Sequence, residues 1–527
     1  MKNILLAALA VAATATAGTY TNPVIPGFYP DPSICRVDSD FYLVNSSFQF
    51  FPGVPLWHSR DLVNWEQIGN VLNRPSQLPL GEANAWLGIY APTIRYNDGT
   101  FYMITTNVGP QAPAAGGNFF VTATDPAGPW SEPVWLEQGG IDPSLYFEDG
   151  KAYMTSNPDG AIWLCEIDPA TGKQLTPSRA IWQGTGGRHP EAPHIYKKDG
   201  WYYLMIAEGG TELGHGVTIA RSRDIYGPYT PDPSNPLLTN FRMAAQGSRI
   251  QGVGHADLVD APDGSWWIVA LGYRTIGNGV HTLGRETMLA PVRWDESAWP
   301  VVNADGTLDV NMNAPLLPQV PVDKPSGRID FTRTRRLGHE WVYLRNPHIN
   351  NYRLDPQGLT LTATPIGLDD SGSPTWTGIR QTQHVFDATT TLCLDPAAPA
   401  GTRAGITVYM DGGSHYDAAV ESLGDGHQQA VCTLRLNAIT HSFEPVGVRA
   451  GSKVTLRVEG EDDMYAFSVS TDGGRTWKPL GRANARYLAT ETAGGFTGMT
   501  IGLFATGPEA ADATFKDFTY NTEKPEK

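Results

Sequence analysis

Five stretches of the chain share one pattern of apolar and polar positions. Each has a short apolar run, a turn rich in Asp and Gly, and a second run that carries aromatic residues; they span 31–44, 91–103, 142–154, 192–204 and 256–268. Asp-Gly between two alternating runs favours a β-hairpin, because glycine accepts the positive φ that a tight turn needs. The pattern therefore predicts five hairpins.

The spacing of the five stretches predicts how the hairpins are arranged. They recur about every 50 to 65 residues, which leaves room for two further strands in each unit and is typical of radial or stacked repeats. No long stretch keeps a helical period, which disfavours a helical solenoid or a (β/α) barrel. We therefore predict an all-β fold with a five-bladed β-propeller over residues 18–312.

The pattern changes after the fifth hairpin. Residues 313–327 contain four prolines and read as an extended connector. From residue 328 to 527 the chain again holds alternating runs, at 359–363, 405–410, 454–458 and 465–470. Such runs are typical of strands that are buried on one face, so a two-sheet β-sandwich is predicted for 328–527.

The first 17 residues have the features of a secretory signal. A lysine precedes an apolar, alanine-rich stretch, and Ala15-Thr16-Ala17 fits a small-residue cleavage site before Gly18. No later apolar run is long enough to span a bilayer. We expect a soluble protein that is secreted or periplasmic.

Charge and cysteine content limit the partners further. The 527 residues carry a formal net charge of -16, which argues against a nucleic-acid partner and suits a neutral substrate. The four cysteines are too few and too scattered for a disulfide framework or paired metal sites. For Cys393 and Cys432, both in strand-like stretches, a disulfide and buried free thiols are equally compatible with the sequence.

Acidic side chains recur where the first strand of each hairpin begins. Asp31 and Asp142 occupy the same position of their copies, and Glu191, Tyr90 and His255 each lie one residue earlier in theirs. In a propeller the beginnings of the innermost strands converge at one end of the central axis. The register thus predicts three carboxylates, a phenol and an imidazole around one site.

Grouped carboxylates suit glycosidic cleavage. That reaction needs one carboxylic acid to protonate the leaving oxygen and one carboxylate to activate water or to attack. Each residue alone has a simpler interpretation, since Asp-Pro-Ser often starts a strand, a lone His255 is more often structural and a lone Tyr90 is more often core. Their shared register favours a functional site.

Two other motifs are predicted to be structural. His189, Glu191 and His194 resemble a metal cluster, but the intervening prolines forbid the helix of a zincin site, and a strand would send His194 to the opposite face. The segment 470–477 has the form of an aspartate-box hairpin and occurs once, after the connector. A turn explains it.

A set of motifs resembles glycoside hydrolase family 43, in the branch of β-xylosidases and α-L-arabinofuranosidases with a C-terminal β-sandwich. The motifs lie at 22–33, 58–65, 88–92, 191–196 and 283–286, and the resemblance covers the chain from its mature N-terminus to about Thr307. It implies a five-bladed propeller, an inverting mechanism and a concanavalin-like or lectin-like jelly roll at the C-terminus.

The resemblance also implies roles for individual residues. Asp31 would be the general base that activates water, Glu191 the general acid, and Asp142 the group that raises the pKa of the acid and orients it. Arg285 would bind substrate hydroxyls. For the remaining residues it implies a sugar pocket walled by Phe48 and Tyr90, with Phe496 at its rim and His255 beneath it.

The chemistry implied in this way requires no cofactor. In some members of the family the histidine at the place of His255 lies beside a calcium ion or a water, so a structural calcium ion is compatible with the sequence. A homo-oligomer is compatible with it as well.

Three functions fit these observations. The first is an exo-acting β-xylosidase that releases xylose from xylo-oligosaccharides. The second is an α-L-arabinofuranosidase that removes arabinose side chains from hemicellulose, and the third is a non-catalytic carbohydrate-binding protein. Trp86 and Leu87 stand where relatives more often carry small residues, which leaves the choice of substrate open.

Overall fold

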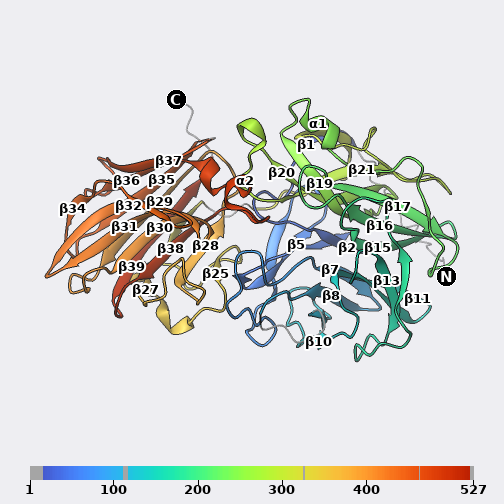
Figure 1. The fold of residues 1–527 in the computed structure, drawn as a ribbon, viewed down its shortest axis with the longest axis horizontal. Helices are drawn as coiled ribbons and strands as arrows, with labels where there is room; N and C mark the ends of the chain where they lie inside the picture. The colour runs from blue at the N-terminus through green and yellow to red at the C-terminus, as the bar shows by residue number, and fades with distance from the viewer. Residues whose placement is uncertain (1–15, 111–116, 324–326, 462, 523–527) are drawn as a thin grey trace, which may run out of the picture.

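The computed structural model describes residues 16–110, 117–323, 327–461 and 463–522, which form two β-rich units side by side (Figure 1). The predicted signal segment lies outside the described residues except for Thr16 and Ala17, which begin strand β1. Helical segments within the described ranges are short: α1 (Phe241–Ala244), α2 (Thr490–Ala493), η1 (Gly277–Gly279), η2 (Ile349–Asn351) and η3 (Ala485–Leu488). No helix in these ranges is long and apolar enough to cross a membrane.

The N-terminal unit is a five-bladed β-propeller, as predicted. Each blade is a four-stranded antiparallel sheet, and the first strands of neighbouring blades contact one another around the hub. The first three blades are β2 (Ser33–Val37), β3 (Asp40–Val44), β5 (Gly53–Ser59) and β6 (Glu66–Leu72); β7 (Thr93–Asn97), β8 (Thr100–Thr106), β9 (Asn118–Ala123) and β10 (Val134–Trp135); and β11 (Ile141–Glu148), β12 (Lys151–Asn157), β13 (Ile162–Ile167) and β14 (Arg179–Trp182). The other two are β15 (Glu191–Lys198), β16 (Trp201–Glu208), β17 (Gly216–Ser222) and β18 (Thr230–Pro231); and β19 (Ile250–Asp260), β20 (Trp266–Arg274), β21 (Glu286–Arg293) and β22 (Val301–Val302).

The turns of the predicted hairpins explain their sequence signal. Asp98, Asp149 and Asp199 have φ between 46° and 51°, and the glycine after each also has a positive φ. Two successive positive φ values are what a two-residue hairpin turn requires, and Asp followed by Gly accepts them at low cost. The fifth hairpin differs, because five residues, 261–265, separate its strands.

The ring closes through the two ends of the propeller segment. Strand β1 (Thr16–Thr21) pairs with β23 (Asn311–Leu316), and the side chain of Asn22 bonds to the backbone of Leu289 in the fifth blade. The predicted connector was placed at residues 313–327, but its first four residues are part of β23. The propeller unit therefore extends further along the chain than its proline content suggested.

The C-terminal unit is a β-sandwich, as predicted, and the four predicted runs lie in β27, β30, β35 and β36. One sheet contains β24 (Arg328–Asp330), β26 (Tyr352–Asp355), β27 (Gly358–Thr362), β29 (Phe386–Leu394), β35 (Val454–Glu461), β36 (Met464–Ser470), β37 (Lys478–Asn484) and β39 (Asp512–Asn521). The other contains β25 (Val342–Leu344), β28 (Thr375–Arg380), β30 (Arg403–Asp411), β31 (Ser414–Gly424), β32 (His427–Leu436), β33 (Ile439–Ser442), β34 (Val446–Arg449), β38 (Thr500–Thr506) and β4 (Phe50–Phe51).

The two units are joined by a strand pair and a shared apolar core. Strand β4 comes from the propeller segment but pairs with β25 of the sandwich. Phe28, Phe48 and Phe50 of the propeller are buried in one cluster with sandwich residues such as Trp376 and Tyr409. Because burial of aromatic surface is strongly favourable, this contact fixes the two units relative to each other.

All four cysteines are free thiols. Cys393 lies on β29 and Cys432 on β32, in different sheets, so the disulfide alternative for this pair is wrong. Burial raises the pKa of both thiols. These cysteines therefore carry no structural cross-link.

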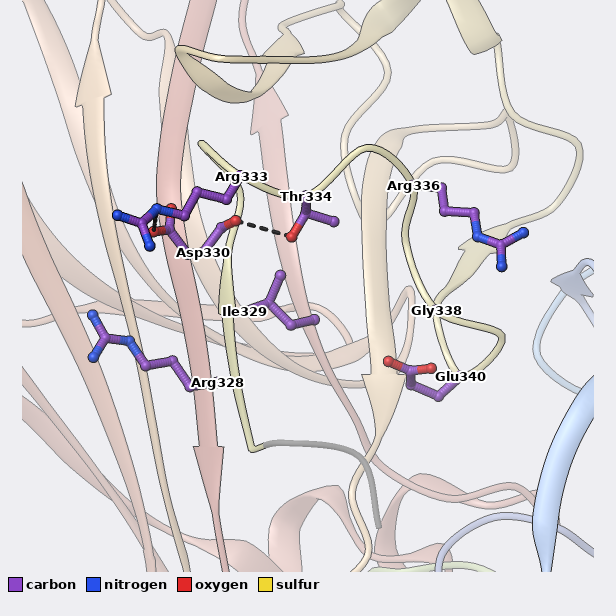
Figure 2. Close-up of a pocket in the computed structure, with 8 residues that line it drawn as sticks. All are labelled: Arg328, Ile329, Asp330, Arg333, Thr334, Arg336, Gly338 and Glu340. Carbon is purple, nitrogen blue, oxygen red and sulfur yellow. Dashed lines mark hydrogen bonds and ion pairs between the residues drawn. The ribbon is translucent and has the colours of Figure 1, made fainter. Parts of the chain in front are cut away.

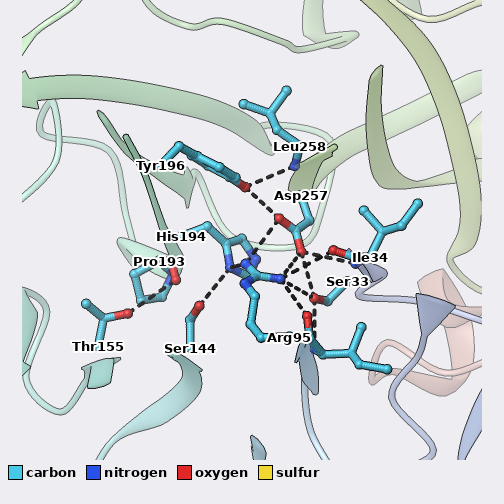
Figure 3. A network of polar contacts seen from close by, with 11 residues as sticks. Ser33, Ile34, Arg95, Ser144, Thr155, Pro193, His194, Tyr196, Asp257 and Leu258 are labelled. Carbon is cyan, nitrogen blue, oxygen red and sulfur yellow. Dashed lines mark hydrogen bonds and ion pairs between the residues drawn. The ribbon is translucent and has the colours of Figure 1, made fainter. Parts of the chain in front are cut away.

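A buried polar network ties all five blades together at the hub (Figure 3). The carboxylate of Asp257 on β19 accepts hydrogen bonds from Arg95 at 2.7 Å and from Tyr196 at 2.6 Å. It also accepts one from Ser33 at 2.7 Å, while Ser144 lies 3.0 Å from a ring nitrogen of His194. Burial raises the pKa of Asp257, but Arg95 and His194 outweigh burial and hold that pKa well below its usual range.

We predict that Asp257→Ala destabilises the protein by about 3 to 5 kcal/mol, because it leaves the buried guanidinium of Arg95 without its counter-charge. Urea unfolding followed by tryptophan fluorescence measures the loss. The matched control is Asp260→Ala, three residues along the same strand, which removes only the partly exposed ion pair to Arg36. It should cost less than about 1 kcal/mol, and equal losses in the two variants would contradict a structural role for the network.

Candidate active site

The backbone at the start of the inner strands aims side chains at the propeller axis. Asp31, Asp142 and His255 have φ of 53°, 53° and 44°, a left-handed conformation that non-glycine residues rarely adopt. Ala192, next to Glu191, has φ of 53°. Such strain persists where the surrounding structure enforces it, often at functional sites.

One register prediction is wrong. His255 was placed one residue before the position of Asp31, but the backbone gives it the same left-handed position. Two residues after each left-handed residue comes a member of the hub network: Ser33, Ser144, His194 and Asp257. The turn of the fifth hairpin is longer than the turns of the others. When the five hairpins are aligned on their turns, His255 therefore falls one residue before the position that its backbone occupies.

The three predicted carboxylates meet at this end of the ring. Asp31 and Asp142 are only 4% and 7% exposed, and Glu191 begins strand β15. The backbone amide of Ala192 donates a hydrogen bond to the carboxylate of Asp142. The charges of Asp31 and Glu191 both act on Asp142, so the three groups form one electrostatic unit.

Asp31 is held by a buried cation. Arg285 donates a hydrogen bond from Nη1 to Oδ1 of Asp31 at 2.8 Å, and the hydroxyl of Ser46 donates to Oδ2. Burial by itself raises the pKa of Asp31, but Arg285, His255 and Ser46 outweigh it, so the pKa lies below its ordinary value. Asp31 is therefore ionised near neutral pH.

Glu191 and Asp142 are shifted in the opposite direction. Burial and the negative charge of Asp31 raise the pKa of Glu191 to about 7, although Arg285 acts against them. Burial and the charges of Glu191 and Asp31 raise the pKa of Asp142 well above its ordinary value. These two carboxyls retain protons under conditions where Asp31 has none, so the site holds an acid beside a base.

Aromatic rings from both domains line the same region. The ring centroid of Phe48 lies 5.4 Å from that of Tyr90 and 5.5 Å from that of Phe496. Arg285 lies over the rings of Phe48 and Phe496, at 5.7 and 5.3 Å, and donates from Nε to the backbone oxygen of Phe496. The structure thus brings together every residue predicted for the substrate, including one from the sandwich.

His255 lies beneath the carboxylates. Its Nδ1 is 3.7 Å from Asp31 and 3.9 Å from Asp142, and burial lowers its pKa. Calcium takes six to eight oxygen ligands, whereas no group of three His, Cys, Asp or Glu in the described ranges could hold a metal ion. The expected calcium ion beside His255 stays a prediction.

The structure separates the members of the motif at 189–194 and explains the segment 470–477 as a turn. Glu191 faces the carboxylate site while His194 lies in the hub network, as expected for neighbours on opposite faces of a strand. Asp472 in the segment 470–477 accepts hydrogen bonds from the backbone of Arg475 and Thr476 and closes a turn between β36 and β37.

Sequence reasoning did not assign the residues that hold Arg285 and Asp31 in place. Ser46 follows strand β3, and Thr211 accepts a hydrogen bond from Arg285 at 3.1 Å. Both lie after the second strand of a blade, a part of the unit that the hairpin repeat does not cover. The sequence offered no signal for the role of either residue.

Two hollows lie apart from the carboxylates. One of about 350 Å³ is lined only by residues of the segment 328–340, at the start of the sandwich (Figure 2). The other, of about 1000 Å³, is lined by the α1 segment, residues 275–277 and Leu213, two residues beyond Thr211. Phe241 is 55% exposed in that larger hollow.

Comparison with known proteins agrees with this architecture. The pattern of glycosyl hydrolases family 43 matches residues 20–300, and that of the beta xylosidase C-terminal concanavalin A-like domain matches residues 328–521. A non-reducing end alpha-L-arabinofuranosidase of Bacteroides ovatus is 41% identical over 95% of this chain and 94% of its own. A xylosidase/arabinosidase of Butyrivibrio fibrisolvens is 39% identical over 95% and 98%, respectively.

A solved structure shares the full two-domain arrangement. The family 43 protein of a Bacteroides ovatus xyloglucan locus superimposes with a TM-score of 0.91 at 40% identity, over 96% of this chain and all of the other. The family pattern covers the ring that carries Asp31, Asp142 and Glu191, and the second pattern covers the sandwich that supplies Phe496. The chain therefore belongs to glycosyl hydrolases family 43 and is a glycoside hydrolase.

Proposed function

We propose that the protein is an exo-acting, inverting β-xylosidase that releases xylose from the ends of xylo-oligosaccharides. The observation that carries this proposal is the split between Asp31 and Glu191, whose pKa values are moved in opposite directions within one site. Inverting hydrolysis needs a base and an acid present together. A protein that only binds carbohydrate has no need of such a pair.

In the proposed mechanism Asp31 acts as general base. It takes a proton from a water molecule as the water oxygen attacks the anomeric carbon of the terminal sugar. Glu191 gives its proton to the glycosidic oxygen as the bond to the anomeric carbon breaks. One water is consumed, and the released sugar has the opposite anomeric configuration.

Asp142 is proposed to position the acid. It accepts a hydrogen bond from the backbone amide of Ala192, next to Glu191, and so holds the backbone that carries the acid. Arg285 is proposed to contact substrate hydroxyls, since its guanidinium already lies against Phe48 and Phe496. Aromatic rings suit the apolar faces of a sugar, while fixed polar groups suit its hydroxyls.

The sandwich supports the choice of exo-cleavage. Phe496 follows two glycines on a segment that enters the site from the second domain, and its ring lies 6.1 Å from that of Tyr90. We propose that this segment blocks the passage of a continuous polymer. Such an arrangement favours attack on chain ends.

α-L-Arabinofuranosidase activity is the second candidate. The arabinofuranosidase of Bacteroides ovatus, 41% identical to this chain, favours it. A β-D-xyloside and an α-L-arabinofuranoside present similar shapes to a small pocket, so one site can serve both.

We predict release of free xylose from xylobiose and xylotriose, and a higher kcat/KM for the aryl β-D-xyloside than for the aryl α-L-arabinofuranoside. Following the first product by NMR tests inversion, because the α-anomer should appear first from a β-xyloside. Asp31→Asn should lower kcat at least a thousandfold, since it removes the base. Arabinose as the main product would favour the second candidate, and turnover of neither glycoside would refute both.

We predict that kcat/KM falls as the pH rises through about 7, because deprotonation of Glu191 removes the acid. On the acidic side, activity should persist to below about pH 4, the ordinary pKa of an aspartate, since Asp31 stays ionised there. Incubation at each pH followed by assay at pH 6 separates this effect from unfolding. A rate that keeps rising to pH 8 or 9 would contradict the assignment of Glu191 as the acid.

A further inference from the structure

Trp86 is an exposed aromatic residue in contact with Tyr90, which lines the site. Its side chain is 40% exposed, although tryptophan is usually largely buried. It lies in the segment between the first and second blades, four residues before Tyr90. Aromatic side chains commonly line ligand-binding sites.

The backbone of Trp86 is fixed on both sides. The phenol of Tyr90 donates a hydrogen bond to the carbonyl oxygen of Trp86 at 2.9 Å, and the amide of Trp86 donates to the side chain of Asn84 at 2.9 Å. Tyr90 is itself part of the aromatic wall. Any displacement of Trp86 therefore acts on a residue that lines the site.

The indole lies against the loop of the sandwich that enters the site. A β-carbon at Gly495 would lie 2.1 Å from Nε1 of Trp86, and one at Gly494 would lie 3.4 Å from its ring. Gly495 also has φ of 74°, so both space and conformation require glycine there. The backbone at Gly494 and Gly495 therefore lies over one face of the indole, and the side chain still keeps 40% of its surface exposed.

The contact with Gly495 joins Trp86 to the residues around Arg285. Gly495 precedes Phe496, whose backbone oxygen accepts a hydrogen bond from Arg285 and whose ring contacts Phe48. Trp86 thus lies at the seam between propeller and sandwich, at the outer end of the aromatic wall. The aromatic wall thus runs from the carboxylates, whose charges act on Tyr90, to Trp86, whose carbonyl oxygen accepts the hydrogen bond of Tyr90.

We propose that the exposed face of Trp86 binds the leaving-group sugar, the unit next to the one that is released. This inference rests on the proposed exo-hydrolysis and assigns its second binding position. The axial C–H groups of a pyranose form an apolar face, and stacking of that face on an aromatic ring is favourable. The anchoring of Trp86 holds the ring in place before the substrate arrives, which limits the entropy lost on binding.

The experiment compares Trp86→Ala and Trp86→Phe with the wild type on the disaccharide or oligosaccharide that the wild type cleaves. Trp86→Ala should lower kcat/KM about 5- to 10-fold, as expected for the loss of one aromatic stacking contact. Trp86→Phe should recover most of the loss. Inhibition by the free monosaccharide product, which occupies only the inner position, should stay within about twofold of wild type.

Two control variants define the alternatives. Tyr96→Ala removes an aromatic residue of the second blade that is 39% exposed, near the C-terminal end of strand β7, and should leave kcat/KM unchanged. Phe241→Ala tests the larger hollow as the place of the leaving group. A lower kcat/KM in Phe241→Ala with an unchanged kcat/KM in Trp86→Ala would overturn the proposal. It would also be overturned if Trp86→Ala weakened inhibition by the monosaccharide as much as it lowered kcat/KM, because Trp86 would then be a structural support of Phe496.

Wild-type turnover separates this proposal from the proposed function. If the wild type cleaves neither a xyloside nor an arabinofuranoside, the proposed function fails. Binding of xylobiose to wild type and Trp86→Ala, measured by calorimetry, then still tests Trp86: a 5- to 10-fold weaker affinity in the variant supports the binding position, and equal affinities refute it.

Discussion

The site depends on one guanidinium buried among three carboxylates. Arg285 carries the positive charge that stabilises ionised Asp31, and burial makes that interaction stronger than it would be in water. A single cation cannot compensate three anions in the same small volume. Glu191 and Asp142 therefore keep protons to higher pH, and the difference between an acid and a base arises from geometry alone.

The ring and the sandwich together hold this arrangement. The hub network around Asp257 fixes the inner strands. Asp31, Asp142 and His255 each lie two residues before a member of this network, and their left-handed backbone directs their side chains into the site. The sandwich adds the backbone oxygen of Phe496 as a further acceptor for Arg285. Because propeller and sandwich share an apolar core beside the site, the catalytic ring and its aromatic wall are packed against each other.

Much of this could be read from the sequence, because the repeat has a physical cause. The Asp-Gly turns and the fixed distance from turn to strand start predicted the five blades and placed Asp31, Asp142 and Glu191 on one axis. The same reasoning misplaced His255 by one residue, since a longer turn in the fifth hairpin breaks the register. It also did not find Ser46 or the hub role of Asp257, which depend on contacts between blades and leave no local pattern.

The account rests on opposite protonation states of Asp31 and Glu191 at the same pH. Infrared difference spectroscopy of wild type against Glu191→Gln and against Asp31→Asn measures these states directly. The account predicts a protonated-carboxyl band at pH 6 that is lost in Glu191→Gln and disappears as the pH passes about 7, and a carboxylate band at pH 6 that is lost in Asp31→Asn. An ionised Glu191 or a protonated Asp31 at pH 6 would contradict it.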